Sequence, residues 1–278
     1  LNRFKSMIKG DTYQMMIDAG INARAIAGQW AHNYPDQPDR HSELGSGYGL
    51  EAYPNMTRMD WAVELYQWFN YYLKDIGEEP EPMVQIQTND GRWHLEETWP
   101  PEDMAWNMQE IGNSWSVTGS TVNAQGSTVT LVSEELSELT HISGLPTIHL
   151  DVTTQACQGG QIFATLYDNE KDLRLGHATM DIRYRDGGYN AQPTSPFSSY
   201  TMLMEFNPLD VVVPAGHTLR IELTESGEDY LPSPCATNPL GGLDVDGGMI
   251  GLPIIDRPNS HDSWFLAPPW WDQQPIPE

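Results

Sequence analysis

Apolar positions recur at two different spacings, and the change of spacing divides the chain. Between Arg58 and Lys74 the spacing is helical, which predicts an amphipathic helix. Its apolar stripe consists of Trp61, Leu65, Trp68, Phe69 and Tyr72. A second, shorter helix is predicted over residues 11–19, with Gly20 as its C-cap.

Beyond the linker-like stretch Glu78–Pro82, apolar and polar residues alternate with a period of two. The alternating runs are short and are bounded by Gly, Pro, Asn or Asp. They are Met83–Gln87, Val129–Val132, Ile148–Val152, Ile162–Tyr167, Ala178–Tyr184, Tyr200–Phe206 and Leu219–Leu223. Many short strands without intervening helices predict an all-β sandwich or jelly roll.

The first 80 residues have a different organisation. The helix over residues 11–19 is followed by a run of small and β-branched residues, Ala23–Ala27, which predicts a short buried strand. A helix followed by a strand is the closing unit of an α/β sheet. A long irregular loop is predicted over Asn33–Thr57, and the tail Pro268–Glu278 is predicted to be an extended arm. We therefore expect a domain boundary near residue 80.

Composition and charge narrow the function. The 278 residues are 39% hydrophobic and 19% charged, as in a folded protein, and carry a net charge of -25. Binding to nucleic acid requires a basic patch, so it is not expected. No stretch approaches the ~18 apolar residues that span a bilayer, so a membrane partner is not expected either. The acidic surface suits a cationic substrate and slightly favours an extracellular location, while plain solubility is the preferred interpretation of the charge.

Metals and cofactors are not expected. Cys157 and Cys235 are too few for a cysteine-rich zinc site, although they suffice for one disulfide, which the sequence leaves undecided. The eight histidines include no close His-x-x-x-His pair. Asp244–Gly248 has the composition of a calcium loop but lacks its full spacing, so an ordinary turn is the preferred interpretation. Trp93, Trp99, Trp106 and Trp115 are candidates for a sugar or peptide cleft, or for packing between domains.

His32 is the candidate catalytic residue. It lies in the segment Gly28-Gln29-Trp30-Ala31-His32, which follows the predicted strand Ala23–Ala27. An α/β-hydrolase carries its catalytic histidine at this kind of position, in the loop after a core strand. A Gly-x-Ser-x-Gly nucleophile motif is absent from the 278 residues, and Gly112–Ser116 satisfies only half of it. The nucleophile of such an enzyme would therefore lie outside this chain.

Several segments together resemble one family, the X-prolyl dipeptidyl-peptidase / cocaine esterase / α-amino-acid ester hydrolase group of serine hydrolases. Its Gly-x-Trp-x-His motif matches Gly28–His32, and its helix leading into the β domain matches Trp68–Lys74. Further similar segments follow in the family's order. They are Gly91–Trp93, Glu97–Pro101, Ala164–Asp168, Ile182–Gly187 and Val213–Ile221.

The resemblance implies that residues 1–80 are the C-terminal end of an α/β-hydrolase domain, which carries the catalytic His32. It implies that residues 81–278 form a jelly-roll β domain with a C-terminal arm. It implies acyl transfer on a peptide or ester substrate, with an upstream segment supplying the serine. The family's acid would fall near Asn2, Arg3 and Phe4, none of which is acidic, while Asp11 is better placed to begin a helix. A homo-oligomer is compatible with the sequence. A non-catalytic jelly-roll binding module remains the alternative.

Overall fold

Two compact units make up the chain. The computed structural model describes Met15 and residues 18–27, 61–80, 83–89, 92–157, 159–185, 190–227, 235, 238, 240–256 and 265–266. The first unit comprises Leu1–Met104, Asp210–Val212 and Ile255–Glu278, and the second comprises Ala105–Leu209 and Val213–Ile254. The units divide between Met104 and Ala105 rather than near residue 80, where the sequence placed the boundary.

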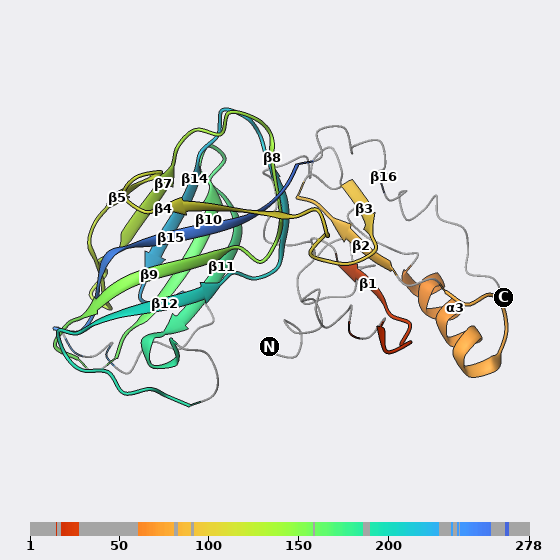
Figure 1. Cartoon of the computed structure of the whole chain (residues 1–278), viewed down its shortest axis with the longest axis horizontal. Helices are drawn as coiled ribbons and strands as arrows, with labels where there is room; N and C mark the ends of the chain where they lie inside the picture. Colours follow the sequence, from red (N-terminus) through yellow and green to blue (C-terminus); the bar gives the residue numbers. More distant parts are fainter. Residues whose placement is uncertain are drawn as a thin grey trace. The chain divides into compact units, whose positions relative to one another are not determined.

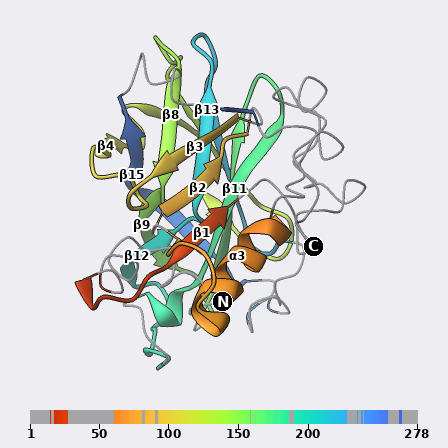
Figure 2. The ribbon, with the colours of Figure 1, turned by 90° about the vertical axis from the view of Figure 1, so that its right-hand side faces the viewer.

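Among the described residues, the first unit contains a four-stranded sheet and the helix α3, Trp61–Lys74 (Figures 1 and 2). The sheet order is β1-β2-β3-β16. Its strands are β1 (Arg24–Ala27), β2 (Met83–Gln87), β3 (Arg92–Glu96) and β16 (Phe265–Leu266). β1 and β2 run parallel, whereas β2–β3 and β3–β16 are antiparallel. Parallel neighbours need a crossover connection, and α3 lies in the chain between β1 and β2.

The pairing of β2 explains the shifted boundary. β2 follows the period-two pattern of the later strands, and this pattern says nothing about which sheet a strand joins. In the structure it pairs with β1, with Ala25 opposite Val84 and Ala27 opposite Ile86. Consecutive residues Val84–Asn89 are all buried. Burial of both faces is typical of a strand covered on two sides, not of one with a solvent face.

The second unit is a two-sheet β-sandwich (Figure 1). One sheet has five strands in the order β11-β10-β14-β7-β5, and the other has seven, in the order β12-β9-β15-β8-β13 with β4 and β6 paired to β15. The strands are β4 (Ala105–Glu110), β5 (Trp115–Thr118), β6 (Thr121–Val122), β7 (Val129–Ser133), β8 (Thr140–Gly144), β9 (Thr147–Thr154), β10 (Gln161–Asp168), β11 (Leu173–Asp181), β12 (Ser199–Glu205), β13 (Leu209–Val213), β14 (Leu219–Thr224) and β15 (Leu243–Ile255).

The core of the sandwich is formed by alternate residues of its strands. In β14, Leu219, Ile221 and Leu223 are buried while the residues between them are half-buried. In β9, Ile148 and Leu150 are fully buried while Asp151 is exposed. Burying each such aliphatic side chain stabilises the fold by ~1.5–3 kcal/mol relative to leaving it exposed. Burial of one face of each strand therefore explains the period-two pattern in the sequence.

Six of the seven strands predicted from alternation are confirmed within one or two residues at each end. The prediction over Ala178–Tyr184 is partly wrong. β11 ends at Asp181, and Ile182–Tyr184 form a short 3-10 helix. The Asp181 carboxylate accepts a hydrogen bond of 2.9 Å from the Arg183 N–H and so caps this helix.

The two predicted helices have different outcomes. α3 is confirmed from Trp61 to Lys74, and part of its apolar stripe is exposed. Leu65 is 40% exposed and Phe69 50%, while Asn70 is buried. Of the shorter helix, Met15 and Asp18 are helical and Gly20 adopts φ +72, the left-handed conformation of a glycine C-cap. Of the helices in these described parts, none is long and apolar enough to cross a membrane.

A disulfide links Cys157 and Cys235, a question that the sequence left open. The two residues are 78 positions apart, and their Cα atoms lie 6.0 Å apart, within the usual range for a disulfide. Both belong to the second unit. Closing a loop of this length stabilises the folded state by ~4 kcal/mol in the chain-entropy model.

Candidate functional site

The strand that precedes His32 is present. β1 covers Arg24–Ala27 and ends one residue before Gly28, so the predicted Gly28–His32 segment starts where the strand stops. Gly28–His32 themselves lie outside the described residues. All four residues of β1 are half-buried, and of the described strands only β2 pairs with it.

Helix α3 is tied to β1 by an ion pair. Arg24 Nη2 lies 2.7 Å from Glu64 Oε2, and both side chains are largely shielded from solvent. The opposite side of α3 presents exposed apolar side chains, including Leu65, Phe69 and Leu73, the last of which is 74% exposed. The described part of the first unit is thus a sheet layer and a helix layer with one apolar helix face left uncovered.

A buried histidine between two carboxylates lies in the first unit. His94 Nδ1 is 2.8 Å from Glu96 Oε1, and His94 Nε2 is 3.0 Å from Asp210 Oδ1. Burial alone would lower the pKa of His94, but the charges and hydrogen bonds of Asp210 and Glu96 outweigh it and raise this pKa to about 9. The ring is therefore a cation at neutral pH, with a proton on each nitrogen.

This arrangement is structural rather than catalytic. Both ring nitrogens of His94 already donate to carboxylates, so neither can accept a proton from a nucleophile. Beside it, Asn89 binds the backbone of Val212 twice, donating to its carbonyl at 3.1 Å and accepting from its N–H at 2.8 Å. Together these contacts hold the segment Asp210–Val212 against the β2–β3 hairpin.

The raised pKa of His94 makes stability depend on pH. Because the folded-state pKa exceeds the unfolded value of 6.5, protonation of His94 stabilises the fold fully below about pH 6.5, and this contribution is lost as pH rises through about 9. We expect the difference in unfolding free energy between the wild type and His94→Asn to shrink by ~3 kcal/mol from pH ~6 to pH ~10, measured by urea unfolding. A difference that stays constant across this range would contradict the assignment.

The sequence pattern does not single out this cluster. His94 and Glu96 are two residues apart on β3, so an alternating strand places them on one face, which is a signal that could have been used. Asp210 lies 116 residues from His94. Because Asp210 lies within the valine-rich strand β13, the sequence indicates a buried carboxylate that needs a partner. The sequence does not indicate which residue that partner is.

A cluster of potential metal ligands lies in the sandwich. Asp168, Glu170 and His217 place ligand atoms within 4.8 Å of one another. Asp168 Oδ2 is 2.8 Å from His217 Nδ1, and the Glu170 carboxylate accepts a 2.7 Å hydrogen bond from the Thr218 N–H. Desolvation alone would raise the pKa of Glu170, but the hydrogen bonds from Thr218 lower it overall. These hydrogen bonds give the cluster a structural role, because they link the end of β10 to the start of β14.

The preferred interpretation of Asp244–Gly248 as a turn is wrong, because the segment lies in strand β15. A register shift between Val245 and Gly247 leaves room for the extra residue Asp246. The Asp244 carboxylate accepts hydrogen bonds from Thr121 at 2.6 Å and Gln155 at 2.9 Å. The segment is an interior strand with a bulge, and its acidic side chains bind neighbouring strands.

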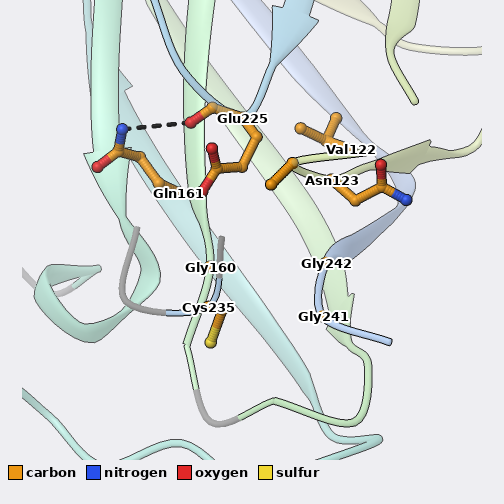
Figure 3. Close-up of a pocket in the computed structure, with 9 residues that line it drawn as sticks. Val122, Asn123, Gly160, Gln161, Glu225, Cys235, Gly241 and Gly242 are labelled. Carbon is orange, nitrogen blue, oxygen red and sulfur yellow. Dashed lines mark hydrogen bonds between the residues drawn. The ribbon is translucent and has the colours of Figure 1, made fainter. Parts of the chain in front are cut away.

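A small pocket opens beside the disulfide (Figure 3). Its enclosed volume is about 10 Å³, room for about one water molecule and far below the roughly 300–1,000 Å³ of usual ligand sites. Gln161 closes one side by donating a 3.2 Å hydrogen bond to the Glu225 carbonyl oxygen. Three glycines, Gly160, Gly241 and Gly242, contribute backbone to its wall. The pocket is too small for a peptide substrate.

The four tryptophans named above separate into two roles. Trp99 and Trp115 are buried in the core, and Trp115 Nε1 donates a 2.6 Å hydrogen bond to Gln109. The half-satisfied nucleophile motif Gly112–Ser116 forms the turn and first residues leading into β5. Trp106 on β4 is 49% exposed, and the side chain of Trp93 lies outside the described residues. The aromatic residues therefore do not line a common cleft in the described structure.

Comparison with known proteins identifies one matching protein family. Residues 107–243 match the family "X-Pro dipeptidyl-peptidase C-terminal non-catalytic domain". No curated protein sequence matches the chain.

Solved structures with a similar fold include three hydrolases. An aminopeptidase from a marine sediment archaeon, Thaumarchaeota archaeon, aligns over 88% of this chain and 52% of its own, with a TM-score of 0.65 and 14% identity. An α-amino acid ester hydrolase aligns over 87% and 52%, with a TM-score of 0.59 and 15% identity. A CocE/NonD family hydrolase from Staphylococcus aureus aligns over 73% and 47%, with a TM-score of 0.56 and 12% identity. The chain thus spans about half the length of these structures, and at such identities the likeness concerns the fold.

Proposed function

We propose that this chain completes a serine hydrolase whose nucleophile lies outside these 278 residues. The proposal proceeds from the family of the chain, because the chain belongs to the X-prolyl dipeptidyl-peptidase / cocaine esterase / α-amino-acid ester hydrolase family as its C-terminal part. Residues 107–243 are the non-catalytic C-terminal domain of that family. The catalytic contribution of the chain therefore has to come from the residues before this domain.

The observation that carries the proposal is the position of β1. This strand ends at Ala27, directly before the Gly-x-Trp-x-His segment that contains His32. It runs parallel to β2, and α3 follows it in the chain, which is the βαβ order of an α/β sheet. A histidine in the loop after such a strand is where the α/β-hydrolase triad has its base. Residues 1–80 thus act as the end of the hydrolase domain.

The uncovered face of α3 supports the same assignment. Leu65, Phe69 and Leu73 lie on a helix whose other side is tied to β1, and an exposed apolar face of this kind marks a surface that another segment covers. The upstream catalytic segment that carries the serine is that segment in our proposal. It would also supply the acid, since the positions near Asn2, Arg3 and Phe4 lack a carboxylate.

The proposed reaction is acyl transfer. The serine attacks a carbonyl carbon while His32 takes its proton, backbone N–H groups stabilise the oxyanion, and His32 returns the proton to the leaving group. Water then attacks the acyl carbon while His32 takes its proton, and His32 returns that proton to the serine oxygen as the acid product leaves. The chain requires no metal or redox cofactor for this chemistry.

The substrate in this proposal is a peptide cleaved from its N-terminus, by aminopeptidase or X-prolyl dipeptidyl-peptidase action. The net charge of -25 favours a cationic α-amino group. An acyl esterase or amino-acid ester hydrolase is the second candidate, because the α-amino acid ester hydrolase is similar over the same share of the chain.

A substrate panel distinguishes these candidates. We expect the full-length protein to release p-nitroaniline from aminoacyl or Xaa-Pro anilides, and to lose kcat/KM by about tenfold or more when the substrate's α-amino group is acetylated. Anilide and ester kinetics are measured side by side. Activity on simple esters with none on any anilide would favour the esterase, and activity on neither would contradict the hydrolase assignment.

A further inference from the structure

One outer face of the sandwich carries an apolar patch. The face is formed by the outward side chains of β4, β15, β9 and β12, whose ribbons lie next to one another in Figure 1. Four large apolar side chains on these strands are exposed by 40–49%, and we call them the outer patch. They are Trp106, Met108, Leu203 and Met249. The alternate residues, such as Leu150, Met202 and Ile250, are fully buried in the core, so the outer patch is not core that happens to be visible.

Strand register makes the outer patch continuous. Leu203 lies opposite His149, and His149 lies opposite Met249, so one row crosses three strands. Met108 lies opposite Gly251 in the next row. A Cβ at Gly251 would be 2.9 Å from Met108 Sδ and 3.3 Å from Trp106 Cε3. The side chains of Trp106 and Met108 therefore lean together over the glycine, where a larger residue would separate them.

The four strands that carry the outer patch are acidic. The four strands contain neither lysine nor arginine. They contain five carboxylates, which are Glu110, Asp151, Glu205, Asp244 and Asp246. Glu110 lies directly opposite Met249, and Asp151 lies two residues after His149 on β9. An apolar centre within a rim of one sign of charge selects its partner by electrostatic complementarity.

We propose that the outer patch is a docking surface for a protein segment in which lysine or arginine alternates with aromatic or aliphatic residues. Apolar side chains of the partner would pack on Trp106, Met108 and Met249, since tryptophan and methionine are enriched at interface centres. Its cations would meet the carboxylates and the face of the Trp106 ring. A second copy of the chain fits less well, because a two-fold contact would bring the same carboxylates against each other. The proposal does not depend on the hydrolase activity.

Peptide binding to the full-length protein tests this proposal. The probe is the N-acetylated, fluorescein-labelled peptide Lys-Trp-Lys-Leu-Lys-Trp-Lys, which presents no free N-terminus for cleavage, and binding is followed by anisotropy. We expect Trp106→Ala combined with Met249→Ser to weaken binding by about tenfold or more, as for loss of an interface centre. Glu110→Gln with Asp151→Asn should weaken binding several-fold and flatten its dependence on salt.

A charge-matched control separates docking from general attraction to an acidic protein. Glu134→Gln with Glu138→Gln removes the same charge from exposed positions between β7 and β8, outside the patch, and should leave binding within about twofold of the wild type. Equal weakening by both charge pairs would overturn the proposal, as would unchanged binding after loss of Trp106 and Met249.

Three other occupants of the patch each have their own outcome, and each would overturn the proposal. Slow peroxide oxidation of Met108 and Met249, at the rate of the buried Met202 and Met204, would show that the rest of the full-length protein covers the face. A concentration-dependent dimer lost on changing Trp106 would assign it to a second copy. Binding of neutral gluco-oligosaccharides, lost with the same variant, would assign it to glycans.

Discussion

Replacing His32 by alanine in the full-length protein is expected to lower kcat by about 10⁴–10⁶-fold while leaving the fold intact. In our account His32 is the base that activates the serine, and no other group in a triad takes over that role. The loss should appear in kcat rather than in KM, because the histidine acts on the transition state more than on the bound substrate. Steady-state kinetics on the best substrate of the panel measures it.

The matched control for this prediction is His149→Ala. His149 is half-buried on β9, in the sandwich, and has no place in the proposed chemistry. It should leave kcat within about twofold of the wild type. Equal losses from both histidine variants would point to damage to the fold, and no loss from His32→Ala would remove this residue from the mechanism.

Replacing Asp210 by alanine is expected to destabilise the protein by about 3–5 kcal/mol. The change removes one of the two carboxylates that hold the buried His94 cation, so the ring must either stay charged with Glu96 alone or lose its proton. Asp210 is 3% exposed, and water cannot replace the lost contact easily. Urea unfolding at neutral pH measures the change.

Two further variants give this second prediction its contrast. Asp210→Asn keeps the size and a hydrogen-bond acceptor, so its loss should be smaller than that of alanine, and it should lower the pKa of His94. Asp151→Ala removes an exposed carboxylate from β9 and should change stability by less than about 1 kcal/mol. A similar small effect from Asp210→Ala would mean that the buried ion cluster contributes little to the fold.

The sequence predicts those parts of the fold in which one face of an element is buried. β7, β9, β12 and β14 alternate because one side packs in the core, and each was found from that pattern. β4 was missed because nearly all of its residues are exposed, and the start of β15 because its acidic residues and paired glycines resemble a turn. In both strands the structure is determined by backbone pairing. Backbone pairing cannot be predicted from the pattern of side chains.

The candidate site divides in the same way. The strand before His32 was predicted because its residues are consecutive, whereas the cluster of His94, Glu96 and Asp210 joins residues that are 116 positions apart. The apolar stripe of α3 predicts the helix, but the spacing of apolar residues does not show which segment covers them, and in the structure Leu65, Phe69 and Tyr72 are exposed.

In the proposed mechanism, His32 activates a serine that lies outside these 278 residues. Labelling the full-length protein with a fluorophosphonate and mapping the modified peptide by mass spectrometry tests it most directly. Our account predicts one labelled serine, located upstream of Leu1, and labelling slowed by about 10³-fold or more in His32→Ala. A labelled serine within residues 1–278, or labelling at the same rate without His32, would contradict it.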